Sequence, residues 1–357
     1  MFGTSSFSAG TSGPAIVALG GGHGLYQTLK AARLCEPSSV TAVVTVADDG
    51  GSSGRIRREL GIVPPGDLRM ALAALAGPGS GARGDREFLS AELLQHRFGG
   101  HGALAGHAVG NLLLSGLIEL SGDVQAALDT VAGLTGSCGR VVAVCTQPLD
   151  IAADVAGLDE DPRVMREVRG QVAVASTPGS VRRVRLVPSD VPAAEPALSA
   201  IAAADLVTLG PGSWFSSVIP HLLVKGVVEA LNQSPARKVV VLNLSAEPGE
   251  TQGFSLERHI HVMAQQAPDL HVDQILVDAA SIPVASERSY LQRAARRLGA
   301  VVDFVDVRAT TADGGPLNVH DPERLARALM ASNAARPVES ARGERAARFG
   351  TADKGSL

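Results

Sequence analysis

The glycine-rich segment near the N-terminus is the sharpest chemical signal in the sequence. It reads Gly20-Gly21-Gly22-His23-Gly24, follows a short apolar run and precedes a stretch with helical spacing. Glycines let a backbone approach an anion without a Cβ clash, and the free amides of a helix start point at that anion. The segment lacks both the dinucleotide GxGxxG spacing and the GKS or GKT of a Walker loop. It predicts a phosphate site, with a structural tight turn as the alternative.

A second polar segment combines two carboxylates with serine hydroxyls. Asp48 and Asp49 follow the apolar run 40–47, and Ser52 and Ser53 come shortly after them. In open α/β sheets, ligands bind beyond the carboxyl ends of the strands. These side chains suit a ribose, a divalent cation or a phosphate, and an ordinary Asp-Gly turn is the alternative.

Two further pairs of residues stand at predicted helix starts. Asp67 and Arg69 follow a Pro-Pro-Gly turn. Asp67 either caps the helix or, together with Arg69, orients a sugar hydroxyl and a phosphate. His107 and Asn111 are four residues apart, so they share one helix face. A lone histidine is usually a structural group, but this pairing at a glycine-marked helix start favours ligand contact.

Two more strands end in polar turns. Gly212 and Ser213 belong to a Gly-Pro-Gly-Ser turn after one predicted strand, and Asn243 lies at the end of another. Ser213 either caps the next helix or contacts a phosphate. One ligand cleft along a single sheet edge explains these loops better than unrelated turns do. The candidate ligand-binding residues are Gly20, Gly21, Gly22, His23, Gly24, Asp48, Asp49, Ser52, Ser53, Asp67, Arg69, His107, Asn111, Gly212, Ser213 and Asn243.

The elements that must position these loops alternate between strand and helix. A strand, a glycine loop, a helix and a strand in succession form a βαβ unit, which predicts a mostly parallel sheet. Strands are expected over 15–19, 40–47, 141–145, 205–210, 238–244, 274–278 and 301–305. Helices are expected from 24 and over 68–76, 86–98, 108–120, 123–134, 196–204, 256–266, 289–298 and 321–332.

Two regions interrupt the alternation. Residues from about 67 to 134 predict a mostly helical insertion, and 215–231 predicts one helix with a break at Pro220. Strands over 151–155, 171–176 and 181–187, with 158–170 as an exposed connection, predict a small antiparallel excursion. We expect one α/β domain over 14–333, a disordered start over 1–13 and a flexible tail over 334–357.

Composition limits the classes of function. The net charge is −4, and aromatic residues make up 3% of the chain, so neither a basic nucleic-acid surface nor a stacking platform is expected. No run of about 18 apolar residues predicts a membrane span. Three cysteines without a CxxC pattern fit a reducing cytoplasm. Known hydrolase and metalloprotease motifs are absent from the sequence.

The loops taken together resemble the CofD-like superfamily. Within it, the sequence is similar to the YvcK-type gluconeogenesis factors, also described as UDP-N-acetylglucosamine-binding proteins. The similarity runs in order from about residue 15 to 330, and VTVADDGGSSGR followed by PPGDLR is highly specific. The matching stretches are ALGGGHGL (18–25), TAVVTVADDGGSSGRIRREL (41–60), PPGDLR (64–69), QHRF (95–98), GHAVGNLL (106–113), GPGS (210–213) and PGET (248–251).

The resemblance implies a fold and a biological role. It implies a Rossmann-like three-layer α/β/α fold, UDP-sugar binding in the glycine-loop cleft, and no established reaction. It also implies a role in gluconeogenic growth, cell shape and peptidoglycan synthesis, whereas better-defined enzymes of the superfamily transfer 2-phospholactate to a deazaflavin precursor. Phosphorylation by a Ser/Thr kinase is a further implication, with candidates at Thr310, Thr311 and Thr351. The sequence departs from many relatives at His23, Met70 and His221.

We therefore expect a cytoplasmic regulatory protein that binds UDP-N-acetylglucosamine. Gly20–Gly24 and Ser213 would hold the diphosphate, Asp48 and Asp49 the ribose or base, and Asn111 and Asn243 the sugar. Mg²⁺ accompanying the nucleotide-sugar is the one cofactor suggested, and homo-oligomerisation is left open.

Two other functions use the same cleft. In the main alternative, a phosphoryl-type transferase, Asp48, Asp49 and Asp67 would hold Mg²⁺ and position an attacking hydroxyl. A weaker alternative is an NAD-binding oxidoreductase, for which the sequence offers no hydride-site constellation.

Overall fold

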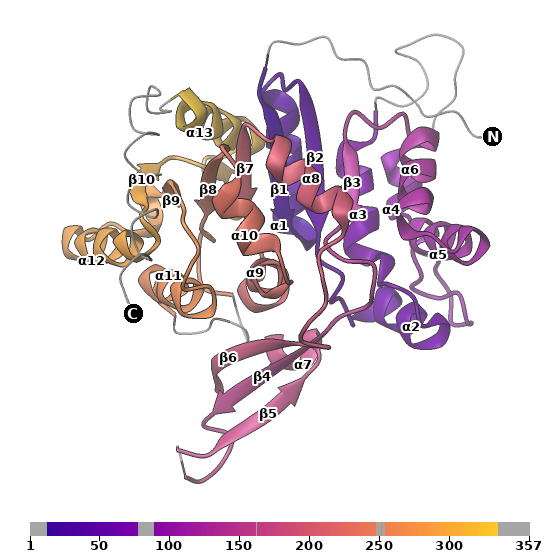
Figure 1. Cartoon of the computed structure of the whole chain (residues 1–357), viewed down its shortest axis with the longest axis horizontal. Helices are drawn as coiled ribbons and strands as arrows, with labels where there is room; N and C mark the ends of the chain where they lie inside the picture. The colour runs from indigo at the N-terminus through magenta and orange to yellow at the C-terminus, as the bar shows by residue number, and fades with distance from the viewer. Residues whose placement is uncertain (1–12, 78–88, 162, 248–250, 252–253, 335–357) are drawn as a thin grey trace, which may run out of the picture.

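A seven-stranded parallel sheet lies at the centre of the molecule (Figure 1). The structure is a computed structural model that describes residues 13–77, 89–161, 163–247, 251 and 254–334. In the described part, the strand order is β10-β9-β8-β7-β1-β2-β3, and each neighbouring pair is parallel. The strands are β1 (Ala15–Gly20), β2 (Ser39–Val44), β3 (Arg140–Ala143), β7 (Leu206–Leu209), β8 (Arg237–Val241), β9 (Gln274–Asp278) and β10 (Val301–Val305).

The strands are short apolar runs because helices cover both faces of the sheet. All four residues of β7 and all five of β9 are buried, as expected for parallel strands inside an α/β protein. Few aromatic side chains contribute to this core, and Trp214 and Phe215 are the largest that are fully buried. Small aliphatic residues therefore provide most of the packing.

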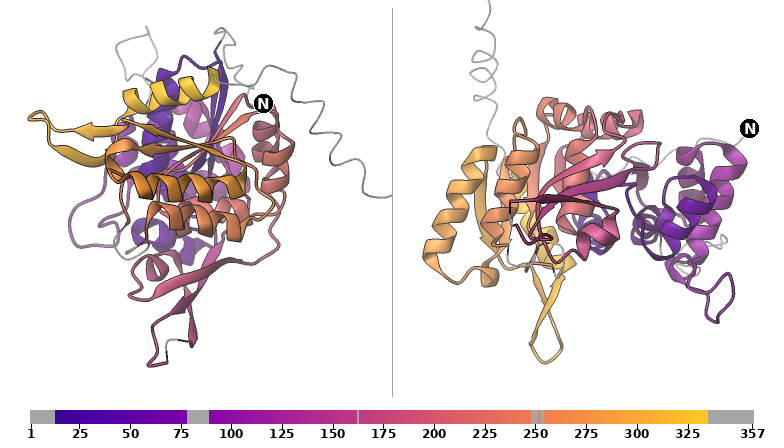
Figure 2. Two further views of the ribbon diagram at one scale, coloured as in Figure 1. Left: turned by 90° about the vertical axis from the view of Figure 1, so that its left-hand side faces the viewer. Right: turned by 90° about the horizontal axis from the view of Figure 1, so that it is seen from below.

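Helices cover the two faces according to the direction of each crossover. Right-handed connections place the helices before and after the reversal of strand order on opposite faces. One face carries α1 (Gly22–Leu34), α3 (Pro65–Leu75) and α13 (Pro322–Ala334), which pack side by side. The other carries α8 (Glu195–Ala203), α10 (Val227–Gln233), α11 (Leu256–Gln266) and α12 (Ala285–Ala295), as Figures 1 and 2 show. The predicted Rossmann-like three-layer fold is confirmed.

The helical insertion lies between β2 and β3. It contains α2 (Gly51–Leu60), α4 (Ala91–Gln95), α5 (Val109–Ser121) and α6 (Val124–Leu134) in addition to α3. Of the helix expected over 86–98, only α4 lies in the described part as a helix, and residues 78–88 are outside it. The second polar segment is only partly a loop, because α2 begins at Gly51 and includes Ser52 and Ser53.

The predicted antiparallel excursion is a three-stranded sheet, which we call the β4–β6 module. It contains β4 (Asp150–Ala156), β5 (Met165–Arg169), α7 (Gln171–Ala175) and β6 (Ser180–Val187), with β4 in the middle. It projects from the carboxyl-terminal edge of the central sheet (Figure 1).

Two expectations about the β4–β6 module are wrong. The strand expected over 171–176 is the helix α7, because the first turn of α7 is capped from outside by the Asp49 carboxylate. The connection expected over 158–170 contains the strand β5, whose mostly exposed, charged residues pair with β4 at an edge of the sheet.

The helix expected over 215–231 is three separate segments. A π-helical turn, η1 (Trp214–Val218), leads into α9 (Ile219–Leu223), and α10 follows after a turn at Gly226. Pro220 does not break a helix, since it lies in the first turn of α9, where its missing N–H has no role. The break occurs instead at Gly226, whose φ is +93°.

Short elements complete the description. The hairpin of β11 (Arg308–Thr310) and β12 (Pro316–His320) was not expected, and η2 (Ala279–Ser281) and η3 (Arg296–Leu298) are 3₁₀ turns. Most of the predicted disordered start (1–13) and flexible tail (334–357) lies outside the described residues, together with Thr351, while Ala334 is described and ends α13.

Candidate functional site

Two glycine loops meet where the strand order reverses. In the sheet order, β1 and β7 are neighbours, with β2 and β3 on one side and β8 to β10 on the other. Such a switch point is where open α/β sheets bind ligands. A Cβ atom on Gly24 would lie 2.1 Å from the Pro211 carbonyl oxygen, so only glycine allows this contact. The Thr28 hydroxyl also donates to the Gly210 carbonyl at 3.3 Å.

Asp67 lies beneath the first glycine loop. A Cβ atom on Gly21 would be 2.4 Å from Oδ2 of Asp67 and 2.8 Å from the methyl group of Thr45. Burial and the nearby Asp48 carboxylate raise the pKa of Asp67 to about 7, while the Gly22 N–H and Arg69 act in the opposite direction. The Asp67 carboxyl is therefore partly protonated near neutral pH. A protonated carboxyl does not repel a phosphate in the loop above it.

Asp48 occupies the adjacent position at the end of β2. Its Oδ1 accepts the Gly50 N–H at 2.9 Å, and its Oδ2 would be 2.6 Å from a Cβ atom on Gly66. Burial raises the pKa of Asp48, which the Gly50 N–H and the Ser53 hydroxyl oppose. Ser53 in turn accepts the Gly66 N–H at 2.9 Å, which joins the starts of α2 and α3.

Asp49 is engaged with the β4–β6 module. Its Oδ1 accepts the N–H of Val172 in α7 at 2.9 Å, and its Oδ2 would be 2.3 Å from a Cβ atom on Gly170. A second link is the ion pair between Arg57 and Asp150, at 2.6 Å. Two side chains that follow β2 therefore hold the module. Among the described residues, no three His, Cys, Asp or Glu side chains are grouped closely enough to hold a metal ion.

Ser52, His107 and Asn111 form one buried network. Asn111 Nδ2 donates to Ser52 Oγ at 3.0 Å, and Ser52 Oγ lies 3.0 Å from His107 Nδ1. Since Ser52 accepts from Asn111, its own proton is available for Nδ1 of a neutral His107. Burial and Arg55 lower the pKa of His107, which favours that neutral form.

Arg69 is buried close to this network. It is 3% exposed, and a Cβ atom on Gly110 would lie 2.8 Å from its Cγ. Its Nε has no hydrogen-bond partner within the described residues. Burial lowers the pKa of Arg69 to about 10; Arg97 adds to this effect, and Asp67 and Asp48 oppose it.

Asn243 positions the second glycine loop. Its Oδ1 accepts the Gly212 N–H and its Nδ2 donates to the Gly212 carbonyl, both at 2.9 Å. The hydroxyls of Ser213 and Ser216 are hydrogen-bonded to each other at the start of η1. Asn243 therefore holds the loop through both ends of its amide, while His23 is exposed at the start of α1.

Sequence reasoning missed two buried groups beside the site. Thr45 follows β2 and is 1% exposed, and its hydroxyl has no partner within the described part of the chain. The feature of the sequence that could have identified Thr45 is its position as a polar residue inside the apolar run 40–47. His221 is fully buried, with Nδ1 2.8 Å from the Ser217 carbonyl oxygen and Nε2 3.0 Å from that of Val43. It fastens α9 to β2.

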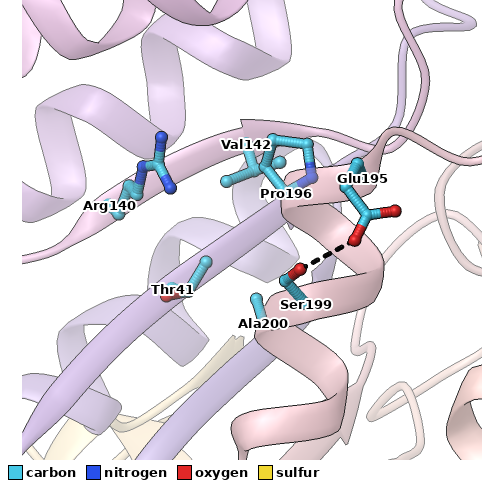
Figure 3. A pocket seen from close by; sticks show the side chains of 7 residues that line it. All are labelled: Thr41, Arg140, Val142, Glu195, Pro196, Ser199 and Ala200. Atoms are coloured by element: carbon cyan, nitrogen blue, oxygen red, sulfur yellow. Dashed lines mark hydrogen bonds between the residues drawn. The ribbon is translucent and has the colours of Figure 1, made fainter.

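A separate cavity of about 440 Å³ lies beside α8, over β2 and β3 (Figure 3). Both charged groups of its lining are already paired, Glu195 with Ser199 and Arg140 with Asp129. None of its lining residues belongs to a strand-end loop, so it is distinct from the candidate site.

Comparisons with known proteins bear on the family and the fold of this chain. The profile of the family described as 2-phospho-L-lactate transferase CofD matches residues 16–313. A putative gluconeogenesis factor of Mycobacterium leprae is 60% identical over 89% of this chain and 86% of its own length. The gluconeogenesis factor of Bacillus subtilis is 36% identical over 79% of this chain and 84% of its own length.

A solved structure is also similar. The crystal structure of a UPF0052 family protein from Bacillus halodurans is matched with a TM-score of 0.75 and 31% identity. The match covers 90% of this chain and all of the other. No helix in the described residues is long and apolar enough to cross a membrane.

Proposed function

Because the chain belongs to the CofD family, we propose that it is a gluconeogenesis factor that binds UDP-N-acetylglucosamine at the switch point of its sheet. The observation that carries this proposal is the direct contact between the loop after β1 and the loop after β7, at Gly24 and Pro211. The two strand-end loops therefore lie against each other, as the binding of one diphosphate by both loops would require.

The chemistry of the loops matches a diphosphate in two ways. Amides in the first turn of α1 have no acceptor within the helix, and the N-cap residue Gly21 has no side chain to cap them, although the Gly22 N–H is bonded to the Asp67 carboxylate. The carboxyl beneath them, Asp67, has a pKa raised to about 7, so the site tolerates added negative charge. Asp48, in the loop that follows β2, would contact the ribose or the base.

Titration calorimetry with UDP-N-acetylglucosamine tests the proposal. The wild-type protein should bind the nucleotide-sugar, and Gly22→Asp should abolish binding because it adds a carboxylate to the glycine loop. Gly116→Ala is the matched control, since a Cβ atom at that exposed helix position meets nothing within 4 Å. Absence of heat from the wild-type protein at millimolar ligand would refute the proposal.

A regulatory role in cells follows from the same binding event. We infer that ligand occupancy controls gluconeogenic growth, cell shape and peptidoglycan synthesis. A strain producing Gly22→Asp in place of the wild-type protein should show the defects of a deletion strain on gluconeogenic carbon. If cells with a variant that does not bind UDP-N-acetylglucosamine grew normally and kept their shape, ligand binding would not be required for the regulatory role.

A transferase activity is the second candidate. The proximity of Asp48 to Asp67, whose pKa it raises, favours this activity, because paired carboxylates can hold Mg²⁺. Asp49 is committed to α7 and would not be a third ligand. Product formation from a nucleotide-linked donor, dependent on Mg²⁺ and lost in Asp48→Asn, would establish this activity.

A further inference from the structure

Side-chain amides cover two of the strand edges in this fold. In the β4–β6 module, β4 lies in the middle, so β5 and β6 each have one side without a neighbouring strand. At β6 the amide of Gln266 in α11, in the orientation that satisfies both groups, donates to the Val184 carbonyl at 3.2 Å and accepts the Val184 N–H at 2.9 Å. At β3, which ends the central sheet, Gln125 donates to the Val141 carbonyl at 3.0 Å. A glutamine therefore replaces a missing strand at both edges.

The outer side of β5 has no such cover among the described residues. There β5 pairs only with β4, and it lies on the side of the module away from α11 (Figure 1). The Gly170 N–H donates to the Ile151 carbonyl at 2.7 Å, so Gly170 and every second residue before it face β4. The backbone groups of Glu167 and Arg169 therefore point outward. An unpaired strand edge of this kind is a template for pairing with another chain.

The chain turns away from this edge where β5 ends. Gly170 has a φ of +92°, a value that favours glycine, and it leads directly into α7. α7 packs against β4 and η1 as well as β5. It therefore lies under the middle of the module and not beyond β5, so the outer side of the strand stays accessible.

One face of the module carries alternating charges that reach this edge. Arg185 of β6 donates to Asp154 of β4 at 2.6 Å and also to Glu167 of β5, which in turn accepts from Arg169. The strand register places all four side chains on the same face, and their formal charges cancel. Like charges at the edge would repel a second strand, whereas an acid and a base two residues apart can pair with an antiparallel copy of themselves.

We propose that β5 is an interface with a second copy of this chain, in which the two β5 strands pair antiparallel around a twofold axis at Val168. In that register Glu167 of each copy lies opposite Arg169 of the other, so their outward backbone groups bond reciprocally and both charge pairs are complementary. A register centred on Glu167 or on Arg169 would place like charges opposite each other. The interface goes beyond the proposed function, because it can be measured whether or not UDP-N-acetylglucosamine binds.

Sedimentation equilibrium of the full chain tests the charge pairing. The wild-type protein should dimerise reversibly, and Glu167→Arg should weaken the dimer at least about tenfold, because the twofold axis makes one substitution alter two pairs. Adding Arg169→Glu restores opposite charges, so the double variant should regain most of the lost affinity. Asp161→Arg, at an exposed ion pair outside β5, is the control and should dimerise like the wild-type protein. A wild-type protein that is monomeric at every soluble concentration, or a dimer that Glu167→Arg leaves unchanged, would overturn the proposal.

Disulfide cross-linking tests the register without altering these charges. In a Cys138→Ser background, which removes the exposed native thiol, Val168→Cys puts two thiols in a directly opposed pair whose Cα separation of ~4.5 Å permits a disulfide. Oxidation should therefore give a covalent dimer on a denaturing gel. Arg166→Cys is the matched control, because in this register it lies opposite Gly170 of the other copy and should stay monomeric. Cross-linking of Arg166→Cys in place of Val168→Cys, or of neither variant, would overturn the proposal.

Discussion

Replacement of Gly24 by alanine tests whether the two glycine loops must touch. The added Cβ atom would lie 2.1 Å from the Pro211 carbonyl oxygen, 2.5 Å from its carbon and 2.7 Å from the Gly212 Cα. All three are backbone atoms, so no side chain can rotate away. A normal contact is about 3.5 Å, and the loops would have to separate by more than 1 Å.

The separation should affect stability and binding to different extents. Overpacking of this kind costs about 1–3 kcal/mol of unfolding free energy. Binding should suffer more than stability, because amides displaced by 1 Å no longer meet the same phosphate oxygens. Urea unfolding measures the first effect, and calorimetry with UDP-N-acetylglucosamine measures the second.

Gly133→Ala in α6 is the matched control. A Cβ atom there meets nothing within 4 Å, so the helix should gain about 0.5–1 kcal/mol and binding should not change. If Gly24→Ala gave the same stability and affinity as the wild-type protein, the contact between the loops would not be needed for the site, and the reasoning would be wrong.

Three further predictions follow from the site. Asp67 has a folded-state pKa of about 7, above its ordinary value of 3.8, so its ionisation destabilises the fold as pH rises between these values. The free energy of unfolding should therefore depend less on pH between 4 and 7 in Asp67→Asn than in the wild-type protein. An unchanged pH dependence would contradict this. Asp49→Ala removes the acceptor for Val172 and should increase proteolysis within the β4–β6 module, whereas Asp129→Ala at the surface should not. His221→Leu should lose about 1–3 kcal/mol in urea unfolding, because it removes a buried donor between two carbonyls, while exposed His101→Leu should not.

The central sheet was predictable because parallel strands are buried on both faces. Runs such as Ile275 to Val277 have no polar residue to place outward, and each is followed by a helical segment. Periodicity therefore indicated both the strands and the parallel arrangement. The β4–β6 module was less predictable, because distant contacts decide its elements: a carboxylate 123 residues away caps α7. The hairpin of β11 and β12 follows the same rule, since the buried Asp278 holds Arg308.

The site was predictable as a set of strand-end loops but not as a set of partners. A sequence places Asp48 and Asp49 side by side, yet one contacts Gly50 and the other contacts α7. Neighbours along a chain can point in opposite directions, and only packing decides which one faces the ligand. Asn243 is similar, because its amide is occupied by the backbone of Gly212. Thr45 escaped notice since apolar neighbours surround it in sequence.

The pairing of β1 with β7 has a consequence for biosynthesis. Thr28 and Gly210, which are hydrogen-bonded across the switch point, are 182 residues apart, and α13 at the far end of the chain packs against α1. A growing chain that has emerged only to α6 has the first glycine loop and Asp67 beneath it, but not the loop after β7 against which the glycine loop packs. Contacts of such long range also slow folding. The proposed ligand site is therefore complete only after β7 and the loop that follows it have been synthesised.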